Sequence, residues 1–237
     1  MERQVGTTPW FAAAGGLAAM AALALPASAI VTAAEEHAAA GSVDGLGFAP
    51  FGWAVVALLG VAVLDVIVAC GLWAVFRAER PGASALAAAF RIAYAAVFIG
   101  AVAMLADARR IVEGSGGSVQ VGELRDAAVI ERLGGFETVW DAGLVLFGMH
   151  LAVIGWLLLR RSGAFAAIVG ALVLLAGAGY VVDSVLGVLL PGTVAVAQFT
   201  FFGEVVLIAW LVVGGIRSTR APKPETAPRR DPEGARR

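Results

Sequence analysis

Six ionisable side chains lie within stretches of the chain that are otherwise apolar. They are Asp65, Arg91, Asp141, His150, Asp183 and Glu204. Carboxyl and imidazole groups in an apolar setting can hold a proton, bind a cation or pair with an arginine. A charged group at the centre of a membrane helix costs about 2.5–3.5 kcal/mol on insertion scales, so each of these groups is expected to have a partner.

Asp65 and Arg91 are predicted to form a buried ion pair. The second and third apolar segments turn near Glu79, which is fourteen residues after Asp65 and twelve before Arg91. At a rise of about 1.5 Å per residue, the two side chains differ by only about 3 Å in depth. The pair can act as a structural clamp or take part in a mechanism. The same count places His150, a polar residue within the membrane, close to their level.

Asp141, Asp183 and Glu204 are predicted to lie in one layer, in the outer part of the membrane. Asp183 and Glu204 lie eleven and ten residues from a turn near Val194, and Asp141 and Asp183 each lie twenty-one residues from a turn near Ser162. Equal counts along helices mean equal depths.

The hypothesis is an acidic pocket, open towards the outside, that binds a ligand or cation. If Asp183 and Glu204 face each other, one of them is expected to hold a proton at neutral pH, or both to share a cation. Tyr180 lies one helical turn from Asp183, and Thr200 lies four residues before Glu204, so both can join the pocket. Asp141 can instead cap the start of its helix at the interface.

The elements that position these groups are six apolar segments, each close to the roughly 20 residues that span a bilayer. The chain is 60% hydrophobic and 15% charged over 237 residues, with a mean hydropathy of +0.87. Strict alternation is absent, which argues against a barrel. The prediction is an all-α, polytopic membrane bundle whose six transmembrane helices cover about 10–34, 51–76, 82–106, 138–159, 164–190 and 197–216, within a single membrane domain, 1–216.

The first segment allows two interpretations. The run that follows Arg3 and reaches Pro26 and Ala29 can be a cleaved signal peptide. The apolar run continues past Ala29, which favours a retained membrane anchor.

The basic residues predict the orientation. With a cytoplasmic amino terminus, twelve basic residues lie inside and four outside, so both termini are predicted to be cytoplasmic. The four lie in an outer loop, 107–137, in which Val121 to Leu133 have the spacing of a short amphipathic helix. The basic tail, 217–237, is rich in proline and charge and is expected to be disordered. The predicted location is the bacterial inner membrane.

Small residues recur on two helices at a spacing that favours close packing. They are Gly148, Ala152 and Gly155 in the fourth segment, and Gly170, Gly177 and Ser184 in the fifth.

Several common kinds of site are missing from the sequence. Cys70 is the only cysteine and His37 and His150 are the only histidines, which excludes a disulfide and a multi-histidine haem or zinc site within one chain. No phosphate-binding loop, GxSxG nucleophile elbow or HExxH motif occurs. No cofactor and no enzyme class is therefore predicted, while a metal remains open.

Three motifs in the carboxyl-terminal half resemble the bacterial DUF4386 family of multi-pass membrane proteins. They are WDAGLVLFGMH at 140–150, YVVDS at 180–184, and the Gly203-Glu204 pair that opens the last helix. The resemblance extends more weakly back to about Phe51. It implies six retained helices, and it implies that the six ionisable residues named at the outset occupy the family's polar positions. The family's function is unknown, so the resemblance implies no reaction.

Two functions remain open. The first is a small transporter or proton- or cation-binding protein that uses the acid layer. The alternative is a non-catalytic membrane scaffold or partner-binding module whose buried charges only clamp helices. An intramembrane enzyme using His150 with the acids is a third idea that lacks a recognisable nucleophile. The expected surroundings are the lipid bilayer, with a homo-oligomer or membrane-protein partner and an unidentified small ligand open, and no nucleic acid.

Overall fold

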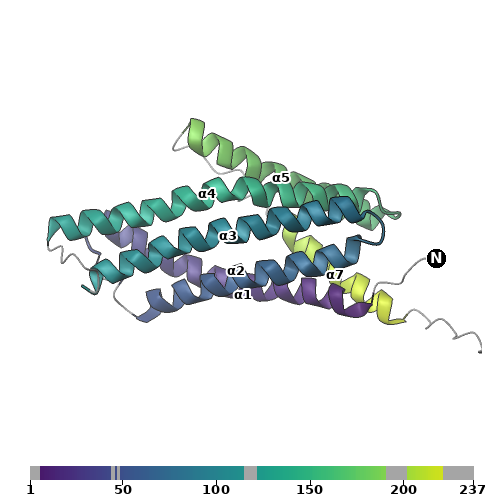
Figure 1. Cartoon of the computed structure of the whole chain (residues 1–237), viewed down its shortest axis with the longest axis horizontal. Coiled ribbons are helices and arrows are strands. Elements are labelled where there is room, and N and C mark those ends of the chain that lie inside the picture. Colours follow the sequence, from purple (N-terminus) through teal and green to yellow (C-terminus); the bar gives the residue numbers. More distant parts are fainter. Residues whose placement is uncertain (1–5, 44–45, 47–48, 115–121, 191–201, 221–237) are drawn as a thin grey trace, which may run out of the picture.

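The structure, a computed structural model, describes residues 6–43, 46, 49–114, 122–190 and 202–220. The described residues form a bundle of six helices and contain no strand (Figure 1). The helices are α1 (Thr7–Ala39), α2 (Ala49–Phe76), α3 (Pro81–Val112), α4 (Glu123–Leu159), α5 (Ala164–Leu189) and α7 (Phe202–Arg220). All six are long and apolar enough to cross a membrane, which confirms the predicted fold class.

The six helices pack in a closed ring. Each helix from α1 to α5 packs against the next one in the chain, and α7 packs against both α5 and α1, while α1 also touches α4. Figure 1 shows the carboxyl-terminal end of α5 diverging from α4. Side chains that point into this ring from different helices therefore meet near its axis.

Local sequence explains where the helices begin at the two short connections. Pro81 stands in the first turn of α3, where its missing N–H would have no partner in any case. Gly163 precedes α5 with a φ of 110°, a backbone conformation that glycine adopts without steric cost. Both connections lie at the same end of the bundle (Figure 1).

The predicted outer loop, 107–137, needs correction. It is largely helical, because α3 continues to Val112 and α4 already begins at Glu123. The predicted separate amphipathic helix is the first part of α4. The predicted bounds were taken from where the apolar residues end. A helix can continue beyond that point into water, because its backbone hydrogen bonds are formed within the helix in either solvent. Leu133 and Phe136 are buried within this extension.

The remaining bounds differ less. α1 starts before and ends after the predicted 10–34, with Pro26 inside it. α7 is described from Phe202, and the earlier part of the predicted 197–216 lies outside the described residues, as does most of the basic tail.

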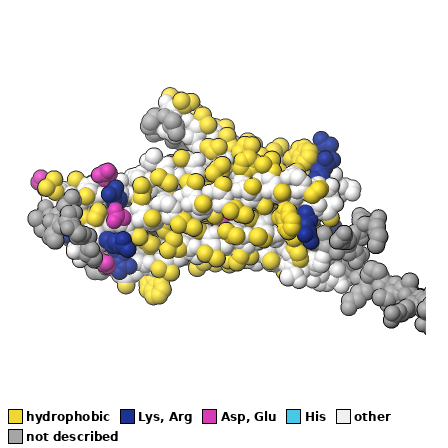
Figure 2. Space-filling model, in the orientation of Figure 1, with side chains coloured by type: hydrophobic (Ala, Val, Ile, Leu, Met, Phe, Trp, Pro, Cys, Tyr) yellow, Lys and Arg dark blue, Asp and Glu magenta, His cyan; other side chains and the backbone are white. Residues whose placement is uncertain are grey.

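The surface of the bundle is apolar over its middle and charged at its ends (Figure 2). Large apolar side chains such as Val63, Ile168 and Leu175 are about 60% exposed. An apolar surface of this kind is unfavourable in water and is suited to contact with lipid.

Candidate functional site

Arg91 on α3 is completely buried and contacts three other helices. Its Nη2 atom lies 2.7 Å from Oδ1 of Asp65 on α2, whose side chain is also completely buried. The same Nη2 lies 3.5 Å from the sulfur of Met20 on α1, and Nη1 lies 3.2 Å from Nε2 of His150 on α4. Asp65 and His150, which were predicted to lie at the depth of Arg91, therefore both contact it.

The two contacts of His150 determine where its proton lies. Nδ1 is 2.8 Å from the carbonyl oxygen of Ala87, which can only accept a hydrogen bond. Nε2 faces Arg91, which can only donate. His150 therefore carries its proton on Nδ1 and is a neutral imidazole that accepts from the guanidinium.

The ion pair is not fully satisfied by its neighbours. Asp65 Oδ2 and Arg91 Nε are buried and make no hydrogen bond within the part of the chain that the structure describes. The pair is thus held through one oxygen rather than in the bidentate geometry that arginine and carboxylate favour. The ring of Phe147 lies 5.2 Å from the Arg91 guanidinium carbon and covers another side of it.

Glu204 and Tyr180 form the second half of the site. The Tyr180 hydroxyl on α5 donates a hydrogen bond of 2.8 Å to the Glu204 carboxylate, in the first turn of α7. Glu204 also lies close enough to Arg91 and Asp65 to interact electrostatically with both. Phe147 lies between this pair and Arg91: its ring centre is 5.2 Å from that of Tyr180 and 5.2 Å from the Arg91 guanidinium carbon.

We call these residues the central cluster: Met20, Asp65, Arg91, His150, Tyr180 and Glu204, one from each of the six helices. Their charges do not sum to zero. Asp65 and Arg91 cancel, and His150 is neutral. A deprotonated Glu204 therefore leaves one negative charge, although the helix start that holds it offers partial compensation.

The outer acid layer is arranged differently from the predicted pocket. Asp141 is exposed and Asp183 half-buried, and the two interact electrostatically. Between them the Ser184 hydroxyl donates to the backbone oxygens of Asp141, at 2.7 Å, and Tyr180, at 3.0 Å. Of the other residues predicted for this pocket, Tyr180 instead binds Glu204 through its hydroxyl. Thr200 lies outside the described residues.

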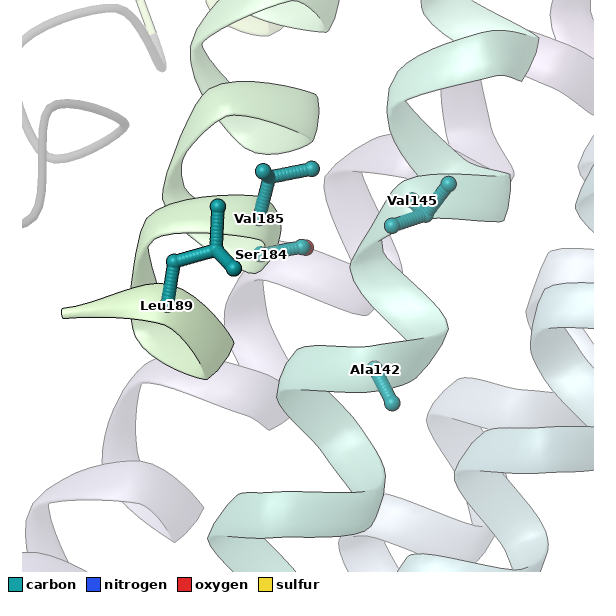
Figure 3. A pocket seen from close by; sticks show the side chains of 5 residues that line it. All are labelled: Ala142, Val145, Ser184, Val185 and Leu189. Atoms are coloured by element: carbon teal, nitrogen blue, oxygen red, sulfur yellow. The ribbon is translucent and has the colours of Figure 1, made fainter. Parts of the chain in front are cut away.

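A pocket of about 330 Å³ opens between α4 and α5 near this level (Figure 3). Its lining is apolar apart from one hydroxyl, and consists of Ala142, Val145, Ser184, Val185 and Leu189. The sequence neighbours of Asp141 and Asp183 line it, rather than the acids themselves. Among the described residues, no group of three or more His, Cys, Asp or Glu side chains is placed to hold a metal ion.

Three residues in or beside the central cluster were not predicted from the sequence. Met20 and Phe147 are apolar and carry no signal in a hydropathy pattern. Tyr94 accepts a hydrogen bond of 3.0 Å from the indole of Trp140. The spacing of three residues between Tyr94 and Arg91 places both on one side of α3, which could have identified Tyr94.

Comparison with known proteins gives a family but no activity. Residues 10–215 match the family described as "Domain of unknown function (DUF4386)". A protein of Archaeoglobus fulgidus described as "Uncharacterized protein" is 31% identical over 171 residues, which are 72% of this chain and 88% of that protein. No solved structure matches. Every residue of the central cluster falls within the matched range.

Proposed function

The chain belongs to the DUF4386 family, a family of unknown function, and from that premise we propose that this multi-pass membrane protein binds a proton or a small cation at Glu204 in the central cluster. The observation that carries the proposal is the charge balance of the cluster. Asp65 and Arg91 neutralise each other at 2.7 Å, and the hydrogen bonds of His150 make it neutral. Within the described part of the cluster, the Glu204 carboxylate is left without a countercharge.

An uncompensated carboxylate within a membrane bundle is costly. A proton removes the charge directly, and a cation balances it. Tyr180 keeps the carboxyl oriented by donating to one oxygen, which leaves the other for the bound species. Ionisable groups inside membrane helices commonly mark ion or proton sites.

Transport is the finer form of this proposal. Because every helix contributes a side chain to the central cluster, occupancy of Glu204 can alter the packing of the whole bundle. A small transporter needs such coupling between a bound ion and helix arrangement. Asp141 on α4 and Asp183 on α5 lie one or more turns from His150 and Tyr180, towards the proposed outer side. An ion that reaches Glu204 from that side would pass them.

One observation favours the alternative, a scaffold or partner-binding module. Arg91 joins α1, α2 and α4 with no exposed surface, which is the geometry expected of a clamp. The two proposals differ in whether the protein responds to protons or cations.

The proposed location is the bacterial inner membrane, with both termini in the cytoplasm. Arginines at the end of the bundle with the two short connections support this orientation, because cytoplasmic loops carry an excess of basic residues. They are Arg77, Arg80, Arg160, Arg161, Arg217 and Arg220. At the opposite end, basic and acidic side chains are mixed (Figure 2).

Thermal unfolding of the detergent-purified protein across pH, and across a series of monovalent and divalent cations, tests the function. We expect the wild-type midpoint to depend on pH or on one cation, and Glu204→Gln to remove that dependence. Asp141→Asn and Asp183→Asn are controls that remove an acid from neighbouring helices and should keep the response. A wild-type protein that responds to neither protons nor cations would favour the scaffold, and a response kept by Glu204→Gln would move the site elsewhere.

A further inference from the structure

Two arginines lie over one tryptophan ring at the end of the bundle that carries the short connections. The guanidinium carbon of Arg80, just before α3, is 5.1 Å from the centre of the Trp156 ring. That of Arg160, just after α4, is 5.2 Å from the same centre. The two cations are therefore separated by at most about twice that distance, and they repel each other.

Nothing acidic in the described part of the chain neutralises this pair. Arg77, Arg80 and Arg160 are exposed and have no carboxylate within ion-pair distance among the residues described. The nearby acid, Glu79, lies 2.6 Å from Arg161 and is already paired.

The opposite end of the bundle is built differently. There, arginines are paired with carboxylates within 2.9 Å: Arg109 with Glu113, Arg125 with Asp126, and Arg132 with Asp107. The dark blue side chains beside yellow ones at the first end, and the mixed blue and magenta at the other, are visible in Figure 2. The charges of Arg77, Arg80 and Arg160 are therefore available to anions from outside the described chain.

The position of the pair favours a lipid over a dissolved anion. Arg80 comes just before the first residue of α3 and Arg160 just after the last residue of α4, at the level where lipid headgroups are expected. Leu86 and Leu159, on the same two helices, are exposed and offer an apolar surface for acyl chains. Trp156 is partly buried, so the ring that holds both arginines is fixed by the bundle.

We propose that Arg80, Arg160 and Trp156 bind the phosphate of one anionic phospholipid, such as phosphatidylglycerol. A phosphodiester carries one negative charge and oxygens that can accept hydrogen bonds from two guanidinium groups at once. The bound lipid links the start of α3 to the end of α4. This site is separate from Glu204 and does not depend on the proposed function.

Native mass spectrometry of the full-length protein with phosphatidylglycerol or phosphatidylcholine tests the proposal. We expect one retained phosphatidylglycerol, and binding about thirtyfold weaker in the Arg80→Gln/Arg160→Gln variant, from the usual contribution of two arginines near an anionic surface. The matched control, Arg77→Gln/Arg217→Gln, removes the same charge at the same end and should retain the lipid. Arg77 lies 4.6 Å from the Trp73 ring, which holds no second arginine among the described residues.

Three outcomes would overturn the proposal. Equal losses in the two double variants would mean a general attraction between the basic end and anionic lipid. Equal retention of phosphatidylcholine would mean that the charge of the headgroup is irrelevant. Competition by millimolar inorganic phosphate would mean a site for a free anion. Unfolding midpoints measured without lipid show whether each variant is folded before its binding is compared.

Discussion

Nε2 of His150 lies 3.2 Å from Nη1 of Arg91 and accepts its hydrogen bond, while Nδ1 donates to the Ala87 carbonyl. Both ring nitrogens are therefore occupied. An enzyme that used His150 as a base would first have to displace the guanidinium that the imidazole holds. The contact makes His150 a positioning residue for Arg91, and it weakens the idea of an intramembrane enzyme.

Removing one partner of the buried ion pair should cost more than removing both. Asp65→Leu removes the carboxylate that contacts Arg91 directly and should lower the free energy of unfolding by about 3–5 kcal/mol. Asp65→Leu/Arg91→Met removes both charges and should recover a large part of that loss. Denaturation by SDS in mixed micelles measures the difference. A double variant less stable than the single one would contradict a simple clamp and indicate that Arg91 has a further obligatory partner.

Tyr180 should act through Glu204. Tyr180→Phe removes a hydrogen bond to a group that can be charged, at a cost of about 1.5–3 kcal/mol. In a Glu204→Leu background the same substitution should cost much less, because the acceptor is gone. The four unfolding free energies form a double-mutant cycle. Additive effects would show that the 2.8 Å contact contributes nothing to stability.

The close contact of α4 with α5 should make Gly177 intolerant of a methyl group. A Cβ atom added there would lie 2.6 Å from the backbone oxygen of Gly148, so the helices would have to separate. We expect Gly177→Ala to cost about 1–3 kcal/mol. Gly187→Ala on the same helix meets no atom of the described residues within 4 Å and is the matched control. Equal unfolding midpoints for the two variants would contradict the close packing.

Arg161 should stabilise the end of the bundle with the short connections through its stacking as well as its charge. Its guanidinium lies 4.6 Å from the Phe76 ring and 5.1 Å from the Trp210 ring, and pairs with Glu79. Arg161→Lys keeps the charge and loses the planar group, so we expect about 1 kcal/mol of destabilisation. Glu79→Gln, at a half-exposed carboxylate, should cost less. The reverse order in thermal unfolding would make the ion pair the main contribution.

Depth along the helices could be predicted from the sequence, and rotation about their axes could not. Counting from the short turns placed Asp65 with Arg91, and His150 near them, because helix rise is constant. The same count placed Asp183 with Glu204, yet the described hydrogen bond to Glu204 comes from Tyr180. Tyr180 lies three residues before Asp183, so the two side chains differ by about 60° in direction and about 4.5 Å in height, and a count from the turns does not decide which of them meets Glu204.

The glycine stripes predicted close packing for two helices without naming the partner of either, because small residues at this spacing let helix backbones approach in lipid. The structure places Gly155 against Gly170 and Gly148 against Gly177. The contacts of Arg161 could not be found in the same way. They depend on Trp10, Phe76 and Trp210, which come from three helices far apart in the sequence.

Three side-chain contacts join α3 and α4 at successive heights: Asp107 with Arg132, Tyr94 with Trp140, and Arg91 with His150. Sliding one helix past the other by one turn, about 5.4 Å, would separate all three pairs beyond hydrogen-bonding range. We therefore expect the two helices to move together as one rigid body. A rearrangement that opens a route to Glu204 would then take place at the contacts of α1, α2, α5 and α7, with the α3–α4 pair as the fixed frame.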